Sequence, residues 1–404
     1  MALLPVDDAI ARLLEGAAPK SAERIELHQC AGRVLAEPVK ALRTQPPFDA
    51  SAMDGYAVRA EDAVLGAMLT VIGEAPAGKA YRGEVGPGEA VRIFTGAPVP
   101  KGGDAIIIQE DVRVSGSSIE VGEAARAGRH IRRRGLDFGE GDVLLPAGRI
   151  LDPAALSLAA AANHPTLNVV AKPLVAIIAT GDELLPPGSA PGPGQIIASN
   201  AYGVAATLEA AGAAILDLGI APDDRAEIGK RINAARAAGA DIIVTLGGAS
   251  VGDHDLVHAV LTEAGMDLSF WKIAMRPGKP LMFGMLGDVR CIGLPGNPVA
   301  SLLCAEIFIK PLVAALAGRT PGQDWREATL SDPMPANDQR QDYVRAFVTQ
   351  DADGHLKAKP YQVQDSSMLR ILAESNAVIV RAPFAPSADA GDPCRLLILR
   401  DPQG

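Results

Sequence analysis

The sequence predicts a multi-domain protein of the α/β plus β class, with a β-rich N-terminal region, a central α/β domain and a small C-terminal β-barrel. Three observations support this prediction. The chain has 404 residues, which is more than a single hydrophobic core usually holds. Strand and helix patterns alternate over residues 173–320, whereas short strand patterns lie on both sides of this segment. Glycine (42) and proline (31) are abundant, which favours many turns and short connections.

The composition argues against several classes of protein. A net charge of -10 disfavours a nucleic-acid partner or an anionic membrane, because either would attract a basic surface. The four cysteines form no CxxC pair, so neither a disulfide framework nor a zinc ribbon is expected. The first residues lack the basic start and apolar run of a signal peptide, and we expect no stretch of transmembrane length. We therefore expect a folded cytoplasmic protein.

The N-terminal part is predicted to contain a short helix followed by a β-rich domain. Apolar residues recur at helical intervals over residues 5–16, whereas residues 42–151 contain short strand patterns separated by Gly and Pro turns. An aspartate and a proline then begin an alanine-rich helix over residues 152–163. We expect residues 1–41 and 152–172 to form a helical and linker region that pairs with the central domain.

The central domain is predicted over residues 173–320. Its alternation of strands and helices implies βαβ crossovers and a mainly parallel sheet in a three-layer α/β/α arrangement. The predicted strands are 174–180, 213–219 and 241–246, and the predicted helices are 200–211, 224–238 and 254–264. A hairpin that turns at residues 287–288 and a helix from Pro298 to near Gly318 complete the domain. Residues 325–404 return to strand patterns and predict the C-terminal β-barrel.

Ligands of doubly wound α/β domains bind beyond the carboxyl ends of the strands, and two such loops combine glycines with acidic residues. Glu183 follows the first strand, and residues 247–255 follow the third. The second loop lets main-chain N–H groups approach a phosphate, but it lacks a Walker A lysine and does not match GxGxxG. Asp253 and Asp255 beside such a loop make electrostatic sense when a divalent cation bridges them, which indicates magnesium.

Two further segments of the central domain are suited to anions. Lys272, Arg276 and Lys279 surround a Pro-Gly turn and concentrate positive charge in an acidic protein. Residues 294–301 precede and begin a helix, so that free N–H groups can face an anion. Taken singly, each of these segments is also explained by ordinary turns, caps or a solvated basic surface.

Three loops of the β-rich region have little helix or strand character. They are residues 46–57, with two aspartates and a methionine, residues 92–105, with Thr95 after a strand, and residues 132–142, with three arginines before Asp137. Because such loops are costly to order, they favour a functional role.

Seven segments taken together resemble, in content and order, the motifs of the MoeA/gephyrin E-domain family of molybdenum insertases. They are PPFDASAMDGYA, FTGAPVPKGGDA, RGLDFGEGD, TGDEL, GGASVGDHD, RPGKP and LPGNPVAS, and the resemblance extends from about Val6 to Arg400. It implies an elongated multi-domain homodimer whose active site lies between the α/β domain of one subunit and the β-rich region of the other. It also implies that adenylylated molybdopterin and molybdate give molybdenum cofactor and AMP, with Mg²⁺ assisting cleavage of the phosphoanhydride.

The resemblance also implies roles for individual residues. Asp54, Thr95 and Asp137 are expected to act from the β-rich region of one subunit. The expected catalytic residues of the other subunit are Glu183, Asp223 or Asp224, Asp255, Lys272, Arg276 and Lys279. Residues expected to contact the pterin or phosphate are Gly247, Gly248, Ser250, Gly252, Pro295, Gly296, Asn297, Pro298 and Ser301. Glu183 and Asp255 are the expected metal ligands, while Arg276 and Lys279 are expected to hold phosphate or molybdate.

Two other functions stay open at this point. The first is a molybdopterin adenylyltransferase, although those enzymes resemble only residues 174–318 of this chain. The second is a non-catalytic scaffold or binding protein of the gephyrin type. Tungstate in place of molybdate also stays open, and a transient contact with the adenylyltransferase is an expected interaction.

Overall fold

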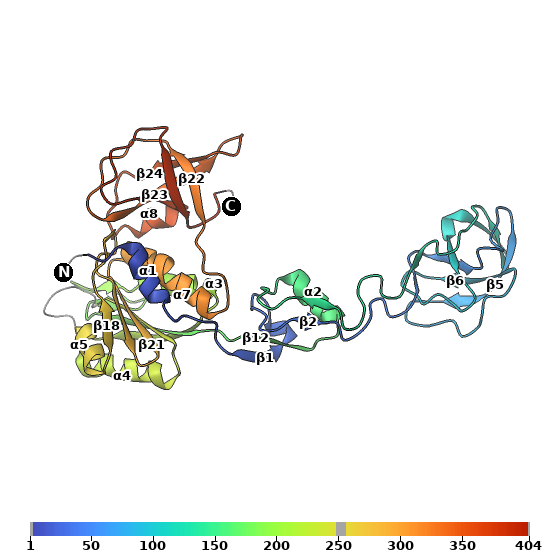
Figure 1. The fold of residues 1–404 in the computed structure, drawn as a ribbon, viewed down its shortest axis with the longest axis horizontal. Helices are drawn as coiled ribbons and strands as arrows, with labels where there is room; N and C mark the ends of the chain where they lie inside the picture. Colours follow the sequence, from blue (N-terminus) through green and yellow to red (C-terminus); the bar gives the residue numbers. More distant parts are fainter. Residues whose placement is uncertain (1–2, 248–255, 403–404) are drawn as a thin grey trace. The chain divides into compact units, whose positions relative to one another are not determined.

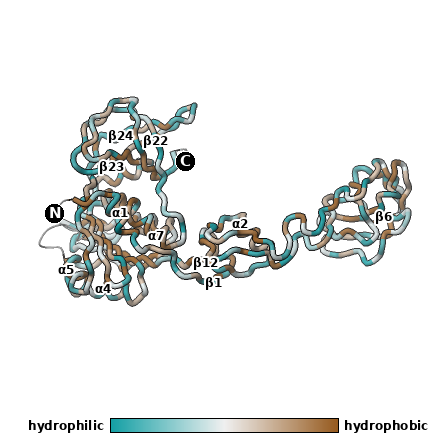
Figure 2. Tube along the Cα trace, in the orientation of Figure 1, coloured by the Kyte–Doolittle hydropathy of each residue, from teal (hydrophilic) through white to brown (hydrophobic). Residues whose placement is uncertain are grey.

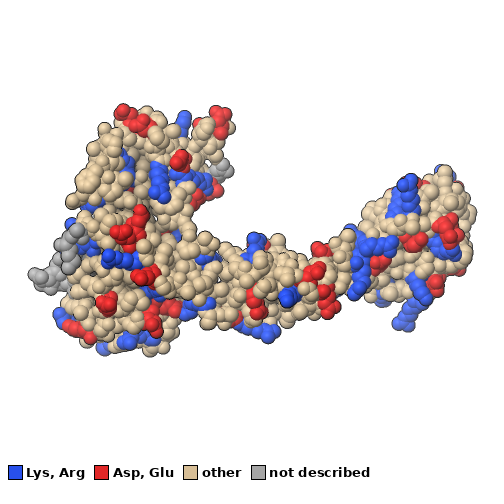
Figure 3. Space-filling view, viewed as in Figure 1, with Lys and Arg blue, Asp and Glu red and all other residues tan. Residues whose placement is uncertain are grey.

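The computed structural model describes residues 3–247 and 256–402, which form two compact units. The larger unit comprises Met1–Glu23 and Val170–Gly404, and the smaller unit comprises Arg24–Val169 (Figure 1). The finer division into domains that the sequence predicts stays a prediction. On the face shown in Figure 3, the acidic and basic side chains of the described residues are interspersed over each unit.

A six-stranded sheet forms the centre of the larger unit. Its strands follow the order β16 (Ala214–Ala221), β13 (Leu174–Thr180), β17 (Ile242–Leu246), β21 (Val289–Leu294), β20 (Met282–Leu286) and β18 (Asp267–Phe270). The first four run parallel, whereas β20 and β18 are antiparallel to their neighbours. Every residue of β17 is buried, as expected of a strand covered on both faces. Figure 2 shows the hydrophobic character of these strands.

Helices cover both faces of this sheet. Alternate residues of a strand point to opposite faces, and those of β17 accordingly belong to two different cores. The helices α1 (Val6–Leu14), α3 (Asn200–Ala211), α6 (Pro298–Cys304) and α7 (Lys310–Leu316) pack on one face, and α4 (Arg225–Ala237) and α5 (Leu256–Glu263) pack on the other (Figure 1). The predicted three-layer α/β/α arrangement is therefore confirmed, with a mixed sheet.

The longest helix runs from Pro298 to Leu316 and contradicts one expectation. It comprises α6, a π-helical turn over Ala305–Ile309 and α7. It is long and apolar enough to cross a membrane by length and composition, so the expectation that no stretch reaches this length was wrong. However, 78% of its most apolar window is buried inside the protein, as in the core helix of a globular domain.

The C-terminal strands close into the expected barrel. They are β22 (Trp325–Leu330), β23 (Gln341–Gln350), β24 (Leu356–Pro360), β25 (Ala377–Arg381) and β26 (Pro393–Ile398). Because β23 pairs with both β24 and β25, these five strands leave no open edge between them. The short strand β19 (Met275–Arg276) extends from the central domain and pairs with β23. The helix α8 (Leu369–Glu374) lies between β24 and β25 in the sequence.

The smaller unit is mostly β, as the sequence predicts. One six-stranded sheet has the order β7 (Ala105–Ile108), β4 (Gly55–Val58), β6 (Glu89–Ile93), β5 (Met68–Ala75), β9 (Ser118–Val121) and β8 (Val112–Ser115). Two-stranded pairs join β1 (Ala22–Glu26) to β12 (Thr166–Val170), β2 (Val39–Lys40) to β11 (Val143–Leu145) and β3 (Ala50–Ser51) to β10 (Ile131–Arg132). The helix α2 (Pro153–Ala161) is capped by Asp152.

Candidate active site

A cavity of about 940 Å³ lies at the carboxyl ends of β13, β17 and β21, where α/β domains of this kind bind ligands. Its walls come from several loops beyond the sheet. Among the residues that line it are Thr180, Gly181, Glu183, Asn200, Asp223, Gly247, Pro295, Gly296, Asn297, Pro298, Ser367 and Leu369. The structure therefore brings together predicted site residues from three different strand-end loops.

Gly247 allows the ends of the central strands to approach closely. Its φ is +93°, and a Cβ atom on it would lie 2.7 Å from the main-chain oxygen of Thr180. Its N–H donates to the carbonyl of Leu294 over 3.2 Å. Because any other residue would be strained and would collide with β13, only glycine fits here without a shift of the main chain.

The acidic side of the cavity presents Glu183 and Asp223, and Asp182 lies next to Glu183 in the sequence and in contact with Asp223. The N–H of Asp223 donates to Oδ1 of Asp182 over 3.0 Å. Burial raises the pKa of the Asp223 carboxyl above its ordinary value, and the negative charges of Asp182 and Glu183 raise it further. A short strand pair beyond Glu183, β14 (Leu184–Leu185) with β15 (Ile196–Ile197), fixes the loop. The local charge thus favours a cation.

Asp223 and Asp224 have different surroundings, although the sequence left either as a candidate. Asp223 lines the cavity. Oδ1 of Asp224 accepts hydrogen bonds from the N–H groups of Ala226 and Glu227 over 2.9 and 3.0 Å, so Asp224 is the N-cap of α4. The geometry favours Asp223 over Asp224 as the residue that faces a ligand.

The C-terminal barrel contributes a wall that the sequence did not indicate. The side-chain amide of Asn297 donates to the Ser366 hydroxyl over 2.8 Å, and the N–H of Val299 donates to the Ser366 carbonyl over 3.1 Å. Asn200, also missed as a lining residue, donates to the Gly296 carbonyl over 2.8 Å. Ser366 lies almost 70 residues after Asn297 in a short polar segment, which carries no recognisable signal.

Ser301 lies in the first turn of α6 and is completely buried. Its hydroxyl oxygen has no hydrogen-bond partner in the described part of the chain. Such an unpaired buried hydroxyl destabilises the fold. Ser301 is not among the residues that line the cavity, so its expected contact with the pterin stays a prediction.

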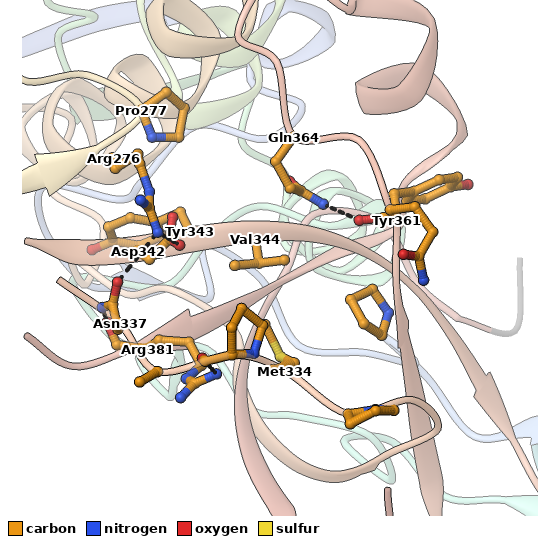
Figure 4. Close-up of a pocket in the computed structure, with 15 residues that line it drawn as sticks. Arg276, Pro277, Met334, Asn337, Asp342, Tyr343, Val344, Tyr361, Gln364 and Arg381 are labelled. Atoms are coloured by element: carbon orange, nitrogen blue, oxygen red, sulfur yellow. Dashed lines mark hydrogen bonds and ion pairs between the residues drawn. The ribbon is translucent and has the colours of Figure 1, made fainter. Parts of the chain in front are cut away.

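Arg276 lies at a second cavity, of about 410 Å³, between the central domain and the barrel (Figure 4). Its guanidinium forms ion pairs with Asp342 and Asp338 and donates to Asn337. Asp342, and to a smaller extent Asp338, raise the pKa of Arg276. The pKa of Asp338 is lowered to about 2, mainly by hydrogen bonds from Arg340. The structure does not place Arg276 among the residues that line the cavity of Glu183. Lys279 is exposed and Lys272 is half-buried.

The smaller unit contains the three remaining candidates, Asp54, Thr95 and Asp137. Oδ1 of Asp54 accepts hydrogen bonds from the N–H and the hydroxyl of Thr95 over 2.7 and 2.8 Å. These bonds are the main reason why the pKa of Asp54 is lowered. Asp137 is exposed, and its N–H donates to the Gln45 carbonyl over 3.0 Å. The structure thus joins Asp54 to Thr95 and places Asp137 in a separate loop.

Four candidates of the glycine-rich loop, Gly248, Ser250, Gly252 and Asp255, lie outside the described residues. Their expected contacts with phosphate and magnesium stay predictions.

Comparisons with known proteins cover nearly the whole chain. Residues 4–163 match a family described as "MoeA N-terminal region (domain I and II)", residues 176–315 match a "Probable molybdopterin binding domain", and residues 327–399 match a "MoeA C-terminal region (domain IV)".

A protein of Haemophilus influenzae named molybdopterin molybdenumtransferase is 35% identical over 399 residues, which are 96% of this chain and 97% of that protein. A protein of Bacillus subtilis with the same name is 35% identical over 413 residues, which are 99% of this chain and 95% of that protein. A crystal structure of the MoeA protein from Pyrococcus horikoshii has a TM-score of 0.82 and 28% identity, and the match covers 99% of this chain and 100% of that one.

Proposed function

Because the chain belongs to the MoeA family of molybdopterin molybdenumtransferases, we propose that it inserts molybdate into adenylylated molybdopterin and releases AMP. This reaction completes the molybdenum cofactor. Its substrates are a pterin that carries a dithiolene and a phosphate, an attached AMP group, and an oxyanion.

The observation that carries the proposal is the cavity at the carboxyl edge of the central sheet. One side presents the carboxylates of Glu183 and Asp223, which suit a divalent cation. Another side presents Gly296, Asn297 and Pro298 at the start of α6, where the positive end of the helix dipole favours an anion. Cleavage of a phosphoanhydride needs both kinds of group, because negative charge develops on oxygens that are already anionic.

The acidic residues fit a magnesium ion. Glu183 and Asp223 supply carboxylate oxygens, the ligands that Mg²⁺ prefers. Desolvation is the main cause of the raised pKa of Asp223, and the negative charges of Asp182 and Glu183, which a cation would offset, raise it further. We propose that Glu183, Asp223 and Asp255 hold the ion. When bound, the ion neutralises charge on the phosphates of the substrate.

We propose that Lys272, Lys279 and Arg276 supply the positive charge that binds molybdate or phosphate. Arg276 already has two carboxylate partners, so an anion that it binds shares the guanidinium with Asp338 and Asp342. Lys279 is exposed and next to Pro280, which lines the cavity. Lys279 is therefore better placed than Arg276 to approach a substrate in the cavity.

We further propose a cytoplasmic homodimer in which Asp54, Thr95 and Asp137 of one subunit face the cavity of the other. A transient contact with the molybdopterin adenylyltransferase would deliver the adenylylated substrate directly. Analytical ultracentrifugation tests the dimer, with a single monomeric species as the contradicting result.

Two alternatives make different predictions. An adenylyltransferase would need only the central domain, whereas the matches to this family also cover residues 4–163 and 327–399, which favours insertion. A scaffold would not need carboxylates gathered in a cavity, so the presence of Glu183 and Asp223 in one cavity favours catalysis.

The test uses purified protein, adenylylated molybdopterin, Mg²⁺ and molybdate, with AMP release as the readout. We expect rapid release by the unchanged protein, a loss of about 100-fold in Glu183→Gln, and no loss in Glu209→Gln, which changes an exposed glutamate of α3. A second incubation contains molybdopterin and ATP without molybdate. Formation of the adenylylated pterin there, with no AMP release in the first incubation, would establish the adenylyltransferase alternative.

A further inference from the structure

Arg92 of β6 lies close to two aromatic rings in the smaller unit. Its guanidinium carbon is 4.9 Å from the centre of the Tyr56 ring and 5.2 Å from the centre of the Phe94 ring. One amino group donates to the side chain of Gln109 over 2.6 Å, and the other donates to the carbonyl of Gly55 over 3.4 Å. The side chain is half-buried and is held by two ring contacts and two hydrogen bonds.

The strand register explains this arrangement. Tyr56 of β4 lies directly opposite Arg92 of β6, so the two side chains lie on the same face of the sheet. Gly55 packs against the neighbouring strand so closely that a Cβ atom on it would lie 1.9 Å from the main-chain oxygen of Ile107. The position of the main chain that follows Asp54 is therefore tightly constrained.

The contacts of Arg92 surround the Asp54–Thr95 pair. Phe94 and Gly55, which Arg92 touches, are the immediate neighbours of Thr95 and Asp54 in the sequence. The carbonyl of Asp54 accepts a hydrogen bond from the N–H of Gln109 over 3.1 Å, and the side chain of Gln109 is the partner of Arg92. Arg92 thus connects the segment that carries Asp54 to the segment that carries Thr95.

We propose that Arg92 is a positioning residue for the reaction, which holds Asp54 and Thr95 in the geometry that presents the Asp54 carboxylate to the substrate. The inference rests on the proposed function, in which Asp54 and Thr95 face the substrate. Both Thr95 donors bind Oδ1 of Asp54, and Oδ2 has no donor among the described residues. That oxygen is available for a contact with a ligand.

Arg92 is poorly suited to bind the substrate itself. Its amino groups are engaged by Gln109 and Gly55, and two aromatic rings lie within about 5 Å of its guanidinium carbon. A substrate anion would have to displace several of these contacts. In addition, Arg92 helps to lower the pKa of Asp54, although the two hydrogen bonds from Thr95 are the larger causes.

The experiment uses the full-length protein and two readouts, one of which needs no substrate. The first is the pKa of the Asp54 carboxyl, followed by carbon NMR and assigned with Asp54→Asn. The second is steady-state AMP release, which separates kcat from KM. The variants are Arg92→Met, Arg92→Lys and the matched control Arg113→Met, which changes an exposed arginine on β8 of the same unit.

In Arg92→Met we expect the pKa of Asp54 to rise and kcat to fall roughly 10- to 100-fold, with KM changed less than about threefold. Arg92→Lys should restore part of kcat, because it keeps the charge but loses the planar fork. Arg113→Met should match the unchanged protein in both readouts. An Arg92→Met protein with an unaltered Asp54 pKa, or with a raised KM and normal kcat, overturns the proposal.

If Arg92→Met does not fold, Gln109→Ala replaces it as the test, because it removes the exposed partner of Arg92 and leaves the charge in place. A rise in the Asp54 pKa with reduced kcat supports the proposal, and unaltered values overturn it. Failure of the proposed function is a separate result: the unchanged protein would release no AMP, whereas the Asp54 pKa would still report on positioning.

Discussion

The adjacent aspartates Asp223 and Asp224 are expected to have different roles, Asp223 in catalysis and Asp224 in the stability of a helix. Asp224 accepts hydrogen bonds from two N–H groups in the first turn of α4, whereas Asp223 lines the cavity with Glu183. Asparagine can replace aspartate as a helix cap, but alanine cannot. Substitutions with these two residues therefore separate loss of the cap from loss of the charge.

Substitution of Asp224 should change stability, whereas substitution of Asp223 should change activity. Removal of an N-cap costs about 1 kcal/mol, so Asp224→Ala should lower the unfolding temperature of the larger unit by roughly 2–4 °C. Asp224→Asn should lower it much less, and both variants should keep AMP release within about threefold of the unchanged protein. Asp223→Asn should reduce AMP release about 100-fold without destabilising the fold, because Asp223 is exposed and its charge is repelled by Asp182 and Glu183.

Calorimetry and hydrogen exchange at the Ala226 and Glu227 amides measure the cap, and the AMP assay measures catalysis. Faster exchange at these amides in Asp224→Ala, but not in Asp223→Asn, is the expected pattern. The reasoning is refuted if Asp224→Asn abolishes AMP release while the unfolding temperature and the exchange rates stay unchanged, since Asp224 would then act on the substrate.

Three further predictions concern residues in or near the same cavity. Ser301→Ala should leave the unfolding temperature unchanged or raise it, because the buried hydroxyl lacks a partner in the described chain; a clear drop in calorimetry would contradict this. Gly247→Ala should lose about 1–3 kcal/mol of stability in chemical denaturation and most AMP release. Gly239→Ala, also at positive φ but with no atom within 4 Å of the new Cβ, should lose less, and equal losses would argue against the predicted collision. Burial and neighbouring charge raise the Asp223 pKa, so the folded state binds this proton more tightly than the unfolded chain and stability falls as pH rises through the folded pKa. Asp182→Asn should lower the pKa of Asp223 in a carbon NMR titration. An unaltered pKa would show that the charge of Asp182 does not raise it.

Much of the central domain could be predicted because its signals are local. The strand Leu174–Thr180 is a continuous apolar run between Pro173 and Gly181, and the helix Asn200–Ala211 ends at Gly212, whose φ of +112° suits glycine. Both match the structure at each end. The expectation about membrane-length segments failed for Pro298–Leu316 because a helix buried on nearly all sides is apolar all round.

The place of the candidate site was also predictable, since loops beyond parallel strands meet at one edge of the sheet. Glu183, Gly247 and Asn297 come from three such loops and line one cavity. The contribution of Ser366 was not predictable, because it depends on how the barrel packs against α6. The surroundings of Arg276 were not predictable either, because its partner Asp342 lies 66 residues away on β23.

The measurement that tests the central claim most directly is the dependence of AMP release on molybdate. Purified protein with adenylylated molybdopterin and Mg²⁺ is assayed with and without molybdate, and the cofactor formed is counted by activation of a cofactor-free molybdenum enzyme. We predict AMP release that requires molybdate and yields one cofactor for each AMP. AMP release at the same rate without molybdate, or AMP without cofactor, would contradict the assignment as a molybdenum insertase.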